Sequence, residues 1–176
     1  MRVDSPFELS PRSLAGWVAF LILLLPARSE ACSCAWAGPL LKVGPRADSM
    51  IRAKVLGYHG RSRGVDLAMD VEVQEVFQGV APAGRIRIWG DNGAQCRPYV
   101  KGFPVQTEWI FAISKLTGEG DSRGDYFING CGEYWAKVEN GNVLGRLSSP
   151  VPPGVADKPE KINLQEFRER LRTAGR

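Results

Sequence analysis

The sequence predicts a mainly β domain, a Greek-key barrel of five or six strands followed by a C-terminal α-helix. Three observations lead to this prediction. Short segments in which apolar and polar residues alternate, such as residues 50–58, follow one another and are separated by Gly- or Pro-containing turns. The alternation breaks at Glu75, before Val76 and Phe77, which indicates the bulge or bend that a small barrel needs at a corner. The last part of the chain has helical periodicity. Together these features fit a barrel of the oligonucleotide/oligosaccharide-binding (OB) type.

Residues 1–31 have the layout of a secretory signal peptide. Residues 14–25 (LAGWVAFLILLL) are uniformly apolar, follow a segment with two arginines and stop at a proline. A membrane span needs about 20 apolar residues, so this run is too short to be one. Ser29 and Ala31 stand where signal peptidase reads small residues, so we expect Cys32 to be the mature N-terminus of a secreted or periplasmic protein. Cleavage a few residues away would leave Cys32 a merely structural cysteine.

Five segments beyond the leader read as strands. They are residues 50–58, 68–77, 85–89, 109–113 and 126–129. Asn140-Gly141, flanked by apolar residues, predicts a tight hairpin.

Between these segments the sequence predicts connections. Residues 38–45 contain two prolines and two glycines and read as an extended segment. Residues 59–64 (HGRSRG) read as a loop that leaves His59 in solvent, and residues 90–93 (GDNG) read as a turn. A calcium loop is not indicated there, because the ligand spacing and the terminal Glu are missing.

The last segment predicts a linker and a helix. Residues 148–154 are Pro-rich, and beyond them Asn163 can cap a helix with Glu166 reciprocating. Three apolar residues of that helix fall on one stripe: Leu164, Phe167 and Leu171. The expected organisation is a signal peptide (1–31), an OB-fold-like domain (32–147) and a linker with a C-terminal helix (148–176).

Composition and motifs narrow the function classes. The formal net charge is +4, and Lys and Arg are scattered without a dense run, so a nucleic-acid partner is not indicated. The chain has a single histidine, no nucleophile–base motif, no phosphate loop and no carboxylate pair singled out by its spacing. We therefore expect a protein that is not an enzyme, needs no cofactor, has no stable membrane span and is monomeric.

Four cysteines in an exported chain indicate two disulfides. A bridge from Cys32 to Cys34, across a single residue, would strain the disulfide and the backbone. Two pairings remain open by physics: Cys32 with Cys96 and Cys34 with Cys131, or Cys32 with Cys131 and Cys34 with Cys96. A zinc site built from these cysteines is not expected, because Cys-x-Cys lacks the usual two-residue spacer.

A mature N-terminus at Cys32 would have distinctive chemistry. An α-amino group has a pKa of about 7.7 to 8.0, so near neutral pH part of it carries a free lone pair that can bind a metal. The carbonyl oxygen of the same residue lies one chelate ring away. A rigid terminus presenting both atoms could fill the open coordination position of a catalytic zinc, which would make the protein a protease inhibitor.

The order of motifs resembles the inhibitory domain of the tissue inhibitors of metalloproteinases. Cys-x-Cys after a signal peptide and residues 47–55 (ADSMIRAKV) look like the start of that domain. Further matches follow in order: residues 71–79 (VEVQEVFQG), residues 86–88 before Cys96, residues 108–112 (EWIFA), and Cys131. The similarity covers about residues 32–147. The third cysteine pair of the family's domain is missing, and residues 35–39 (AWAGP) replace its Pro- and His-containing ridge.

The resemblance implies a function and a set of site residues. It implies a metalloprotease inhibitor that binds the protease through Cys32, Ser33 and Cys34, with the amine and carbonyl of Cys32 on the partner's zinc. Ser33 would point into the adjoining specificity pocket. The resemblance also favours disulfides from Cys32 to Cys96 and from Cys34 to Cys131.

Two other functions are compatible with the sequence. An exported binding module for a carbohydrate or protein would use exposed aromatic residues as stacking platforms, and five are available: Trp36, Trp89, Trp109, Trp135 and Tyr99. A lipid-anchored envelope protein would also start at Cys32, but Ser29 stands where a large aliphatic residue is expected. Lipidation would place a thioether on the sulfur of Cys32 and so prevent inhibition by this terminus.

Overall fold

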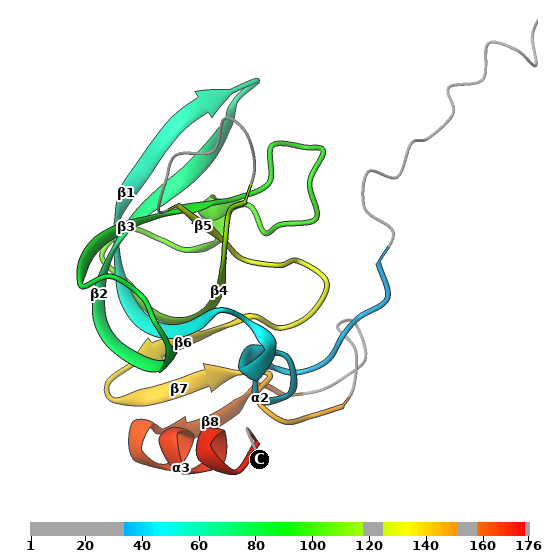
Figure 1. Ribbon diagram of the computed structural model, residues 1–176, viewed down its shortest axis with the longest axis vertical. Helices are drawn as coiled ribbons and strands as arrows, with labels where there is room; N and C mark the ends of the chain where they lie inside the picture. The colour runs from blue at the N-terminus through cyan, green and yellow to red at the C-terminus, as the bar shows by residue number, and fades with distance from the viewer. Residues whose placement is uncertain (1–33, 118–124, 151–157, 175–176) are drawn as a thin grey trace, which may run out of the picture. The chain divides into compact units, whose positions relative to one another are not determined.

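The computed structural model describes residues 34–117, 125–150 and 158–174 (Figure 1). Contacts within the chain set off Ala31–Arg176 as one compact unit. The expected signal peptide, the Pro-rich run from residue 151 and the first two residues of the expected mature chain, Cys32 and Ser33, lie outside the described residues.

The described part of the chain is mainly β, as expected, with eight strands in one mixed sheet and a helix at the C-terminal end. The strands are β1 (Ser49–Ser62), β2 (Val65–Gly79), β3 (Gly84–Trp89), β4 (Glu108–Lys115), β5 (Tyr126–Phe127), β6 (Trp135–Glu139), β7 (Asn142–Gly145) and β8 (Glu160–Asn163). The helices are α2 (Leu40–Val43), η1 (Gly44–Arg46), η2 (Val100–Gly102) and α3 (Leu164–Ala174).

The strand pairings return to their starting point. β1 pairs antiparallel with β2 and with β4, β2 pairs with β3, β3 pairs in parallel with β5, and β5 pairs with β4. A path through β1, β2, β3, β5 and β4 therefore ends on β1 again (Figure 1). From β4 the sheet continues outward through β6 and β7 to β8.

β1 and β2 form a long hairpin whose irregularities follow the sequence. Their register shifts twice near the predicted break in alternation, leaving Gln74 and Phe77 without partners on β1, and this confirms the expected bulge. The prediction of a loop at residues 59–64 is wrong for residues 59–62, which belong to β1. His59 pairs with Ala68 within the strand ladder, and only Arg63 and Gly64 form the turn. A two-stranded ribbon exposed to solvent accepts polar side chains, so composition alone did not reveal the strand.

The other predicted strands are present with small changes of length. Ile86 and Ile88 of β3 are buried, as expected, and β4 is central because it pairs with β1, β5 and β6. β5 spans only two residues of the expected four. The β6–β7 hairpin turns at Asn140 and Gly141, whose φ angles of 50° and 74° are the left-handed values that this dipeptide favours.

One hydrophobic cluster consists mainly of residues from the five cyclically paired strands. Its aromatic centre is Phe103, whose ring packs edge-to-face against Trp109, Phe111 and Trp135 at centroid distances of 5.0, 5.1 and 5.7 Å. Aliphatic side chains of β1, β2 and β3 complete the cluster.

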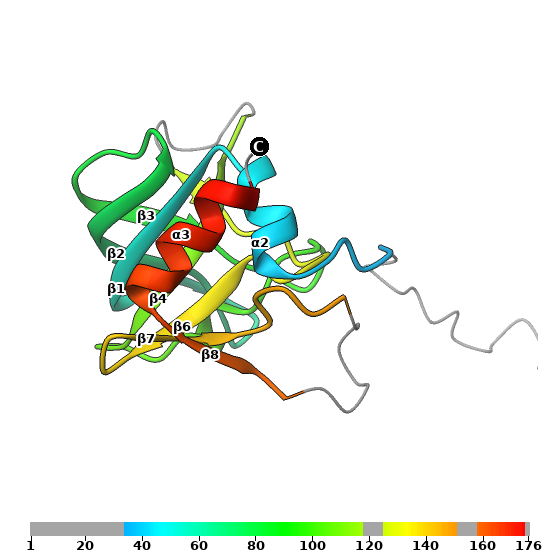
Figure 2. The same cartoon turned by 90° about the horizontal axis from the view of Figure 1, so that it is seen from below.

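A second cluster covers the other face of β1 and β4 and includes two helices. Met50 and Ile110 point to this side and pack with Leu40 of α2 and Phe167 of α3, all fully buried. Figure 2 shows α2 and α3 next to each other over the sheet. The extended segment expected at residues 38–45 is therefore wrong, because burial of its leucines and valine folds it into α2 and η1.

The C-terminal segment joins the sheet before it forms the helix. β8 was not predicted, and it pairs with β7. Asn163 caps α3 as expected, its Oδ1 accepting a hydrogen bond from the Glu166 backbone N–H at 2.9 Å. The Glu166 carboxylate pairs with Arg170 at 2.6 Å. The described part of the expected tail thus packs on the domain. None of the helices described here is long and apolar enough to cross a bilayer.

Candidate functional site

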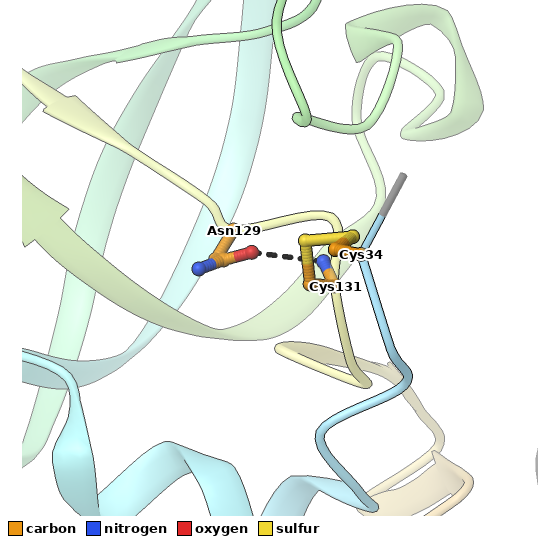
Figure 3. The surroundings of a disulfide bond; sticks show 3 residues. All are labelled: Cys34, Asn129 and Cys131. Carbon is orange, nitrogen blue, oxygen red and sulfur yellow. Dashed lines mark hydrogen bonds between the residues drawn. A yellow bond between two sulfur atoms is a disulfide. The ribbon is translucent and has the colours of Figure 1, made fainter. Parts of the chain in front are cut away.

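The segment that follows the expected N-terminus is fixed by a disulfide. Cys34 is bonded to Cys131, 97 residues away in sequence, with a Cα–Cα distance of 5.7 Å (Figure 3). This is the pairing of Cys34 that the family resemblance implied, and the alternative from Cys34 to Cys96 is wrong. Cys34 is exposed, so the bridge holds the start of the described chain at the surface.

Cys96 lies beside this bridge. It is also disulfide-bonded, and its sulfur lies within 4.8 Å of the sulfurs of Cys34 and Cys131. Its carbonyl oxygen accepts a hydrogen bond from the backbone N–H of Gly130 at 2.8 Å, which ties the two cysteine-bearing loops together. Because Cys32 lies outside the described residues, its pairing with Cys96 stays a prediction.

Backbone hydrogen bonds hold the residues after Cys34. Ala37 N–H donates to the carbonyl of Cys131 at 2.6 Å, and the carbonyl of Gly38 accepts from Glu133 N–H at 3.0 Å. Leu40 N–H donates to the carbonyl of Arg146 at 3.0 Å. Together with the disulfide, these bonds fix residues 34–40 against the loop of Cys131 and the residue that follows β7.

The loop that receives the bridge is itself ordered by side chains that sequence reasoning missed. The Oδ1 of Asn129 accepts a hydrogen bond from the backbone N–H of Cys131 at 2.8 Å (Figure 3). A Cβ on Gly132 would lie 3.2 Å from the carbonyl oxygen of Gly38 and 3.1 Å from the ring of Tyr134, so a larger residue would require these neighbours to move apart. Asn-Gly-Cys-Gly in the sequence is the signal that could have shown a tight turn at this cysteine.

A half-buried ion pair lies behind the same loop. Glu133 Oε1 is 3.7 Å from Arg146 Nε, and the two side chains are 15% and 19% exposed. Burial raises the pKa of Glu133, and the charge of Arg146 opposes that shift. The pair links the residues after Cys131 to the strand end that also bonds Leu40.

The five aromatic residues available as stacking platforms do not gather at one surface. The indole N–H of Trp89 donates to Asp125 at 2.7 Å, and that of Trp109 donates to Thr107 at 2.7 Å. Trp109 and Trp135 pack on the core. Trp36 is half-buried, and its Nε1 is buried without a hydrogen-bond partner among the described residues. Only Tyr99 of the five is exposed, at 52%.

The remaining candidate groups supply no metal site. Cys34, Cys96 and Cys131 are the one cluster of potential ligands found in the described ranges, and sulfurs held in disulfides are not the thiolates that bind zinc. His59 is exposed on the β1–β2 hairpin. Arg97, next to Cys96, lies over the ring of Phe127 at 4.7 Å, a cation–π contact that the sequence did not reveal.

Comparison with known proteins adds no assignment. The chain matches no family model, and no curated protein is significantly similar to it in sequence.

Proposed function

We propose that this protein is an exported inhibitor of zinc metalloproteases, whose mature chain starts at Cys32. In this proposal the α-amine and carbonyl oxygen of Cys32 bind the zinc of a target enzyme, Ser33 enters the adjoining specificity pocket, and Cys34 fixes the segment to the domain. The target belongs to the class of enzymes whose zinc keeps an open position for water or substrate.

The strand pairings support a barrel for this inhibitor. The cycle of β1, β2, β3, β5 and β4 has the pairings that a closed five-stranded barrel requires, and the register shifts in β2 supply the bend of a barrel corner. We infer that this cycle is an OB-type barrel. Such a fold hosts many functions, so the choice among them depends on the terminus and not on the barrel.

The observation that carries the proposal is the fixed, exposed position of Cys34. The bridge to Cys131 and the backbone bonds of Ala37 and Gly38 hold the chain just two residues beyond Cys32. Cys96, the expected partner of Cys32, brings its sulfur within 4.8 Å of that bridge. Two adjacent bridges would pin both ends of the Cys-x-Cys segment. A pinned terminus loses little conformational entropy when it binds zinc, which is the condition for tight chelation.

The proposal first requires the correct N-terminus. Intact mass and peptide mapping of the exported protein without reduction should show a chain that starts at an unmodified Cys32 and a peptide that joins Cys32 to Cys96. A diacylglyceryl mass on Cys32 would instead identify the lipid-anchored alternative, and a start downstream of Cys32 would remove the chelating residue.

The decisive experiment adds one alanine ahead of Cys32. It moves the amine by about 3.8 Å, nearly twice a zinc–nitrogen bond of about 2.0 Å, so the chelate cannot form. The mature protein should inhibit at least one member of a panel of zinc endopeptidases in a fluorogenic peptide assay, and the extended protein should not. Thermal unfolding of the two proteins should coincide, which excludes misfolding.

A matched substitution tests the role of the second residue. Ser33→Ala keeps the amine and the carbonyl of Cys32 in place, so it should change the order of preference among the proteases with a smaller loss of inhibition. Equal inhibition by the extended and mature proteins would refute chelation. Absence of inhibition by either would leave a barrel that serves another partner.

A further inference from the structure

Three cysteine sulfurs gather at one place in the structure. The sulfur of Cys96 lies within 4.8 Å of both sulfurs of the bridge between Cys34 and Cys131. Cys96 is itself disulfide-bonded, and its predicted partner is Cys32. Reduction of the Cys96 bridge therefore produces a thiol next to a second, intact disulfide. Thiol–disulfide exchange begins with the attack of a thiolate on a disulfide sulfur, so this arrangement places a nucleophile beside its target.

The backbone of Cys96 touches the residue that precedes Cys131. Its carbonyl oxygen accepts a hydrogen bond from the backbone N–H of Gly130 at 2.8 Å. A Cβ on Gly130 would lie 3.0 Å from that oxygen and 3.1 Å from the carbonyl carbon of Cys96, so the two loops are in direct contact. This contact and the short distance between the sulfurs favour a new bond from Cys96 to Cys131.

The two cysteines of the attacked bridge differ in their exposure. Cys34 is exposed and Cys131 is half-buried (Figure 3). Water therefore stabilises a thiolate on Cys34 better than one on Cys131, and exchange is faster when the more stable thiolate leaves. Attack on the sulfur of Cys131 releases Cys34 as this better leaving group.

We propose that Cys96 is a nucleophile for thiol–disulfide exchange, which takes Cys131 from Cys34 once a dithiol reductant has opened its own bridge. The dithiol supplies two electrons and two protons, becomes a disulfide, and leaves Cys96 and its partner as thiols. The Cys96 thiol then loses its proton to water, and the thiolate bonds to the sulfur of Cys131.

The bond between Cys34 and Cys131 breaks in the same step. Its electron pair leaves with the sulfur of Cys34, and this thiolate takes up a proton from water. The exchange itself involves no net oxidation or reduction, because one disulfide and one thiol are present before and after it.

The exchange detaches the start of the described chain from the domain. Backbone hydrogen bonds of Ala37 and Leu40 remain, whereas the residues before Ala37 lose their covalent tie to Cys131. The new bridge instead joins two loops that already touch. A reductant thus releases the N-terminal segment and leaves a crosslink within the domain. The inference concerns the bridges alone, so it stands or falls independently of the proposed inhibition.

The first test uses the full exported protein with Cys32→Ser, which leaves Cys96 without its predicted partner. The form with the bridge from Cys34 to Cys131 is purified in acid, where thiols are protonated, and is then moved to pH 8. Thiols are labelled with N-ethylmaleimide after increasing times, and the peptides are mapped without reduction. The label should move from Cys96 to Cys34 at a rate independent of protein concentration, while a peptide that joins Cys96 to Cys131 appears.

Two glycine substitutions in this variant test the contact between the loops. Gly130→Ala places a Cβ 3.0 Å from the carbonyl oxygen of Cys96, so it should push the loops apart and slow the exchange about tenfold. Gly102→Ala is the control, because a Cβ there meets no atom within 4 Å, and it should leave the rate unchanged. A label that stays on Cys96 or moves to Cys131, a rate that rises with protein concentration, or equal rates in the two glycine variants would overturn the proposal.

The unaltered protein provides a test that does not depend on the folding of a variant. The exported protein is treated with limiting dithiothreitol at pH 8 and is then labelled and mapped in the same way. The species with one remaining bridge should include one that joins Cys96 to Cys131 and carries labels on Cys32 and Cys34. Single-bridge species without this crosslink would overturn the proposal.

Discussion

Arg168 of α3 and Glu75 of β2, 93 residues apart in sequence, form a two-pronged ion pair with both hydrogen bonds at 2.9 Å. Phe167, the residue before Arg168, is fully buried, and Leu171, about one turn further along α3, is 7% exposed. The C-terminal helix is therefore fixed to the bent end of the long hairpin by both packing and charge. The sequence showed the helix and its apolar stripe but not where that stripe is buried.

We predict that α3 is required for the stability of the domain. Phe167→Ala should lower the free energy of unfolding by about 3–5 kcal/mol, measured by urea denaturation, because it leaves a cavity in the second hydrophobic cluster, where Phe167 is fully buried. Arg168→Ala should cost about 1 kcal/mol or less, since its ion pair is partly exposed. Glu169→Ala, exposed on the same helix, is the control and should change stability by less than about 0.5 kcal/mol.

Truncation after Ser148 gives a stronger form of this prediction. The deletion removes β8 from the sheet and uncovers Met50 and Ile110, so the cooperative unfolding transition should be lost or shifted far down in temperature. A truncated protein that unfolds as cooperatively as the full chain would show that the linker separates an independent helix.

Two tryptophans that look alike in the sequence should respond in opposite ways to removal of their indole N–H. Nε1 of Trp36 is buried without a hydrogen-bond partner in the described structure, and a buried unsatisfied donor costs about 1–3 kcal/mol. Trp36→Phe should therefore leave stability unchanged or raise it. Trp89→Phe removes the 2.7 Å hydrogen bond to Asp125, a residue that is only 9% exposed. This substitution should lower the free energy of unfolding by about 2–3 kcal/mol.

Chemical denaturation of the two variants at neutral pH checks this contrast. A loss of stability in Trp36→Phe as large as in Trp89→Phe would mean that packing of the indole ring, and not the satisfaction of its N–H, decides the effect.

Glu160 should make the stability of the C-terminal segment depend on pH. Burial opposes its ionisation, but hydrogen bonds from Ser148 and Ser149 and the charge of Arg170 outweigh burial and lower the pKa of Glu160. A carboxylate with a lowered pKa in the folded state stabilises the protein above its ordinary pKa, and that contribution is lost as the pH falls through the folded value.

The measurement compares Glu160→Gln with the parent protein by thermal unfolding at pH 7 and pH 3. At pH 7 the substitution should cost about 1 kcal/mol, because it weakens bonds that a charged acceptor makes with Ser148 and Arg170. At pH 3 the difference should shrink. Glu72→Gln, on the exposed part of β2 and without a side-chain hydrogen bond to the described residues, is the control. A cost that grew toward low pH would contradict the assignment.

Short sequence patterns predicted the elements whose structure depends on neighbouring residues. The alternation in β1 to β4, the bulge near Phe77, the Asn140-Gly141 turn and the cap at Asn163 all follow from side-chain preferences of neighbouring residues. Three elements were missed. The polar end of β1 pairs with the nearby start of β2 in a solvent-exposed ribbon, so its polar side chains carried no strand signal. The helix α2 and the short strand β8 are formed by contacts with residues distant in sequence, so their own residues carried no matching signal.

The sequence likewise predicted only part of the candidate site. Spacing left two disulfide pairings open, and only the family resemblance favoured the bond from Cys34 to Cys131 that the structure contains. Asn129 bonds Cys131 two residues on, and the run Asn-Gly-Cys-Gly could have shown that turn. Gly132 and Glu133 could not be recognised as part of the site, because their roles depend on the approach of Gly38 from almost a hundred positions earlier in the sequence.

The proposed chelation predicts that inhibition weakens as the pH falls. The amine of Cys32 must lose its proton to bind zinc, and its ordinary pKa is about 7.7 to 8.0. Below that value each unit of pH should weaken inhibition about tenfold, because binding then releases one proton. Inhibition constants measured from pH 8.5 down to pH 6 against one zinc endopeptidase should follow this slope.

The enzyme's own titration is removed by measuring a small neutral zinc ligand under the same conditions and taking the ratio of the two inhibition constants. The protein lacks histidine near Cys34, its single histidine being His59 on the hairpin of β1 and β2, so the amine is the group of the terminal segment that titrates in this range. A ratio that stays constant with pH would mean that the inhibitor reaches the enzyme through another part of its surface.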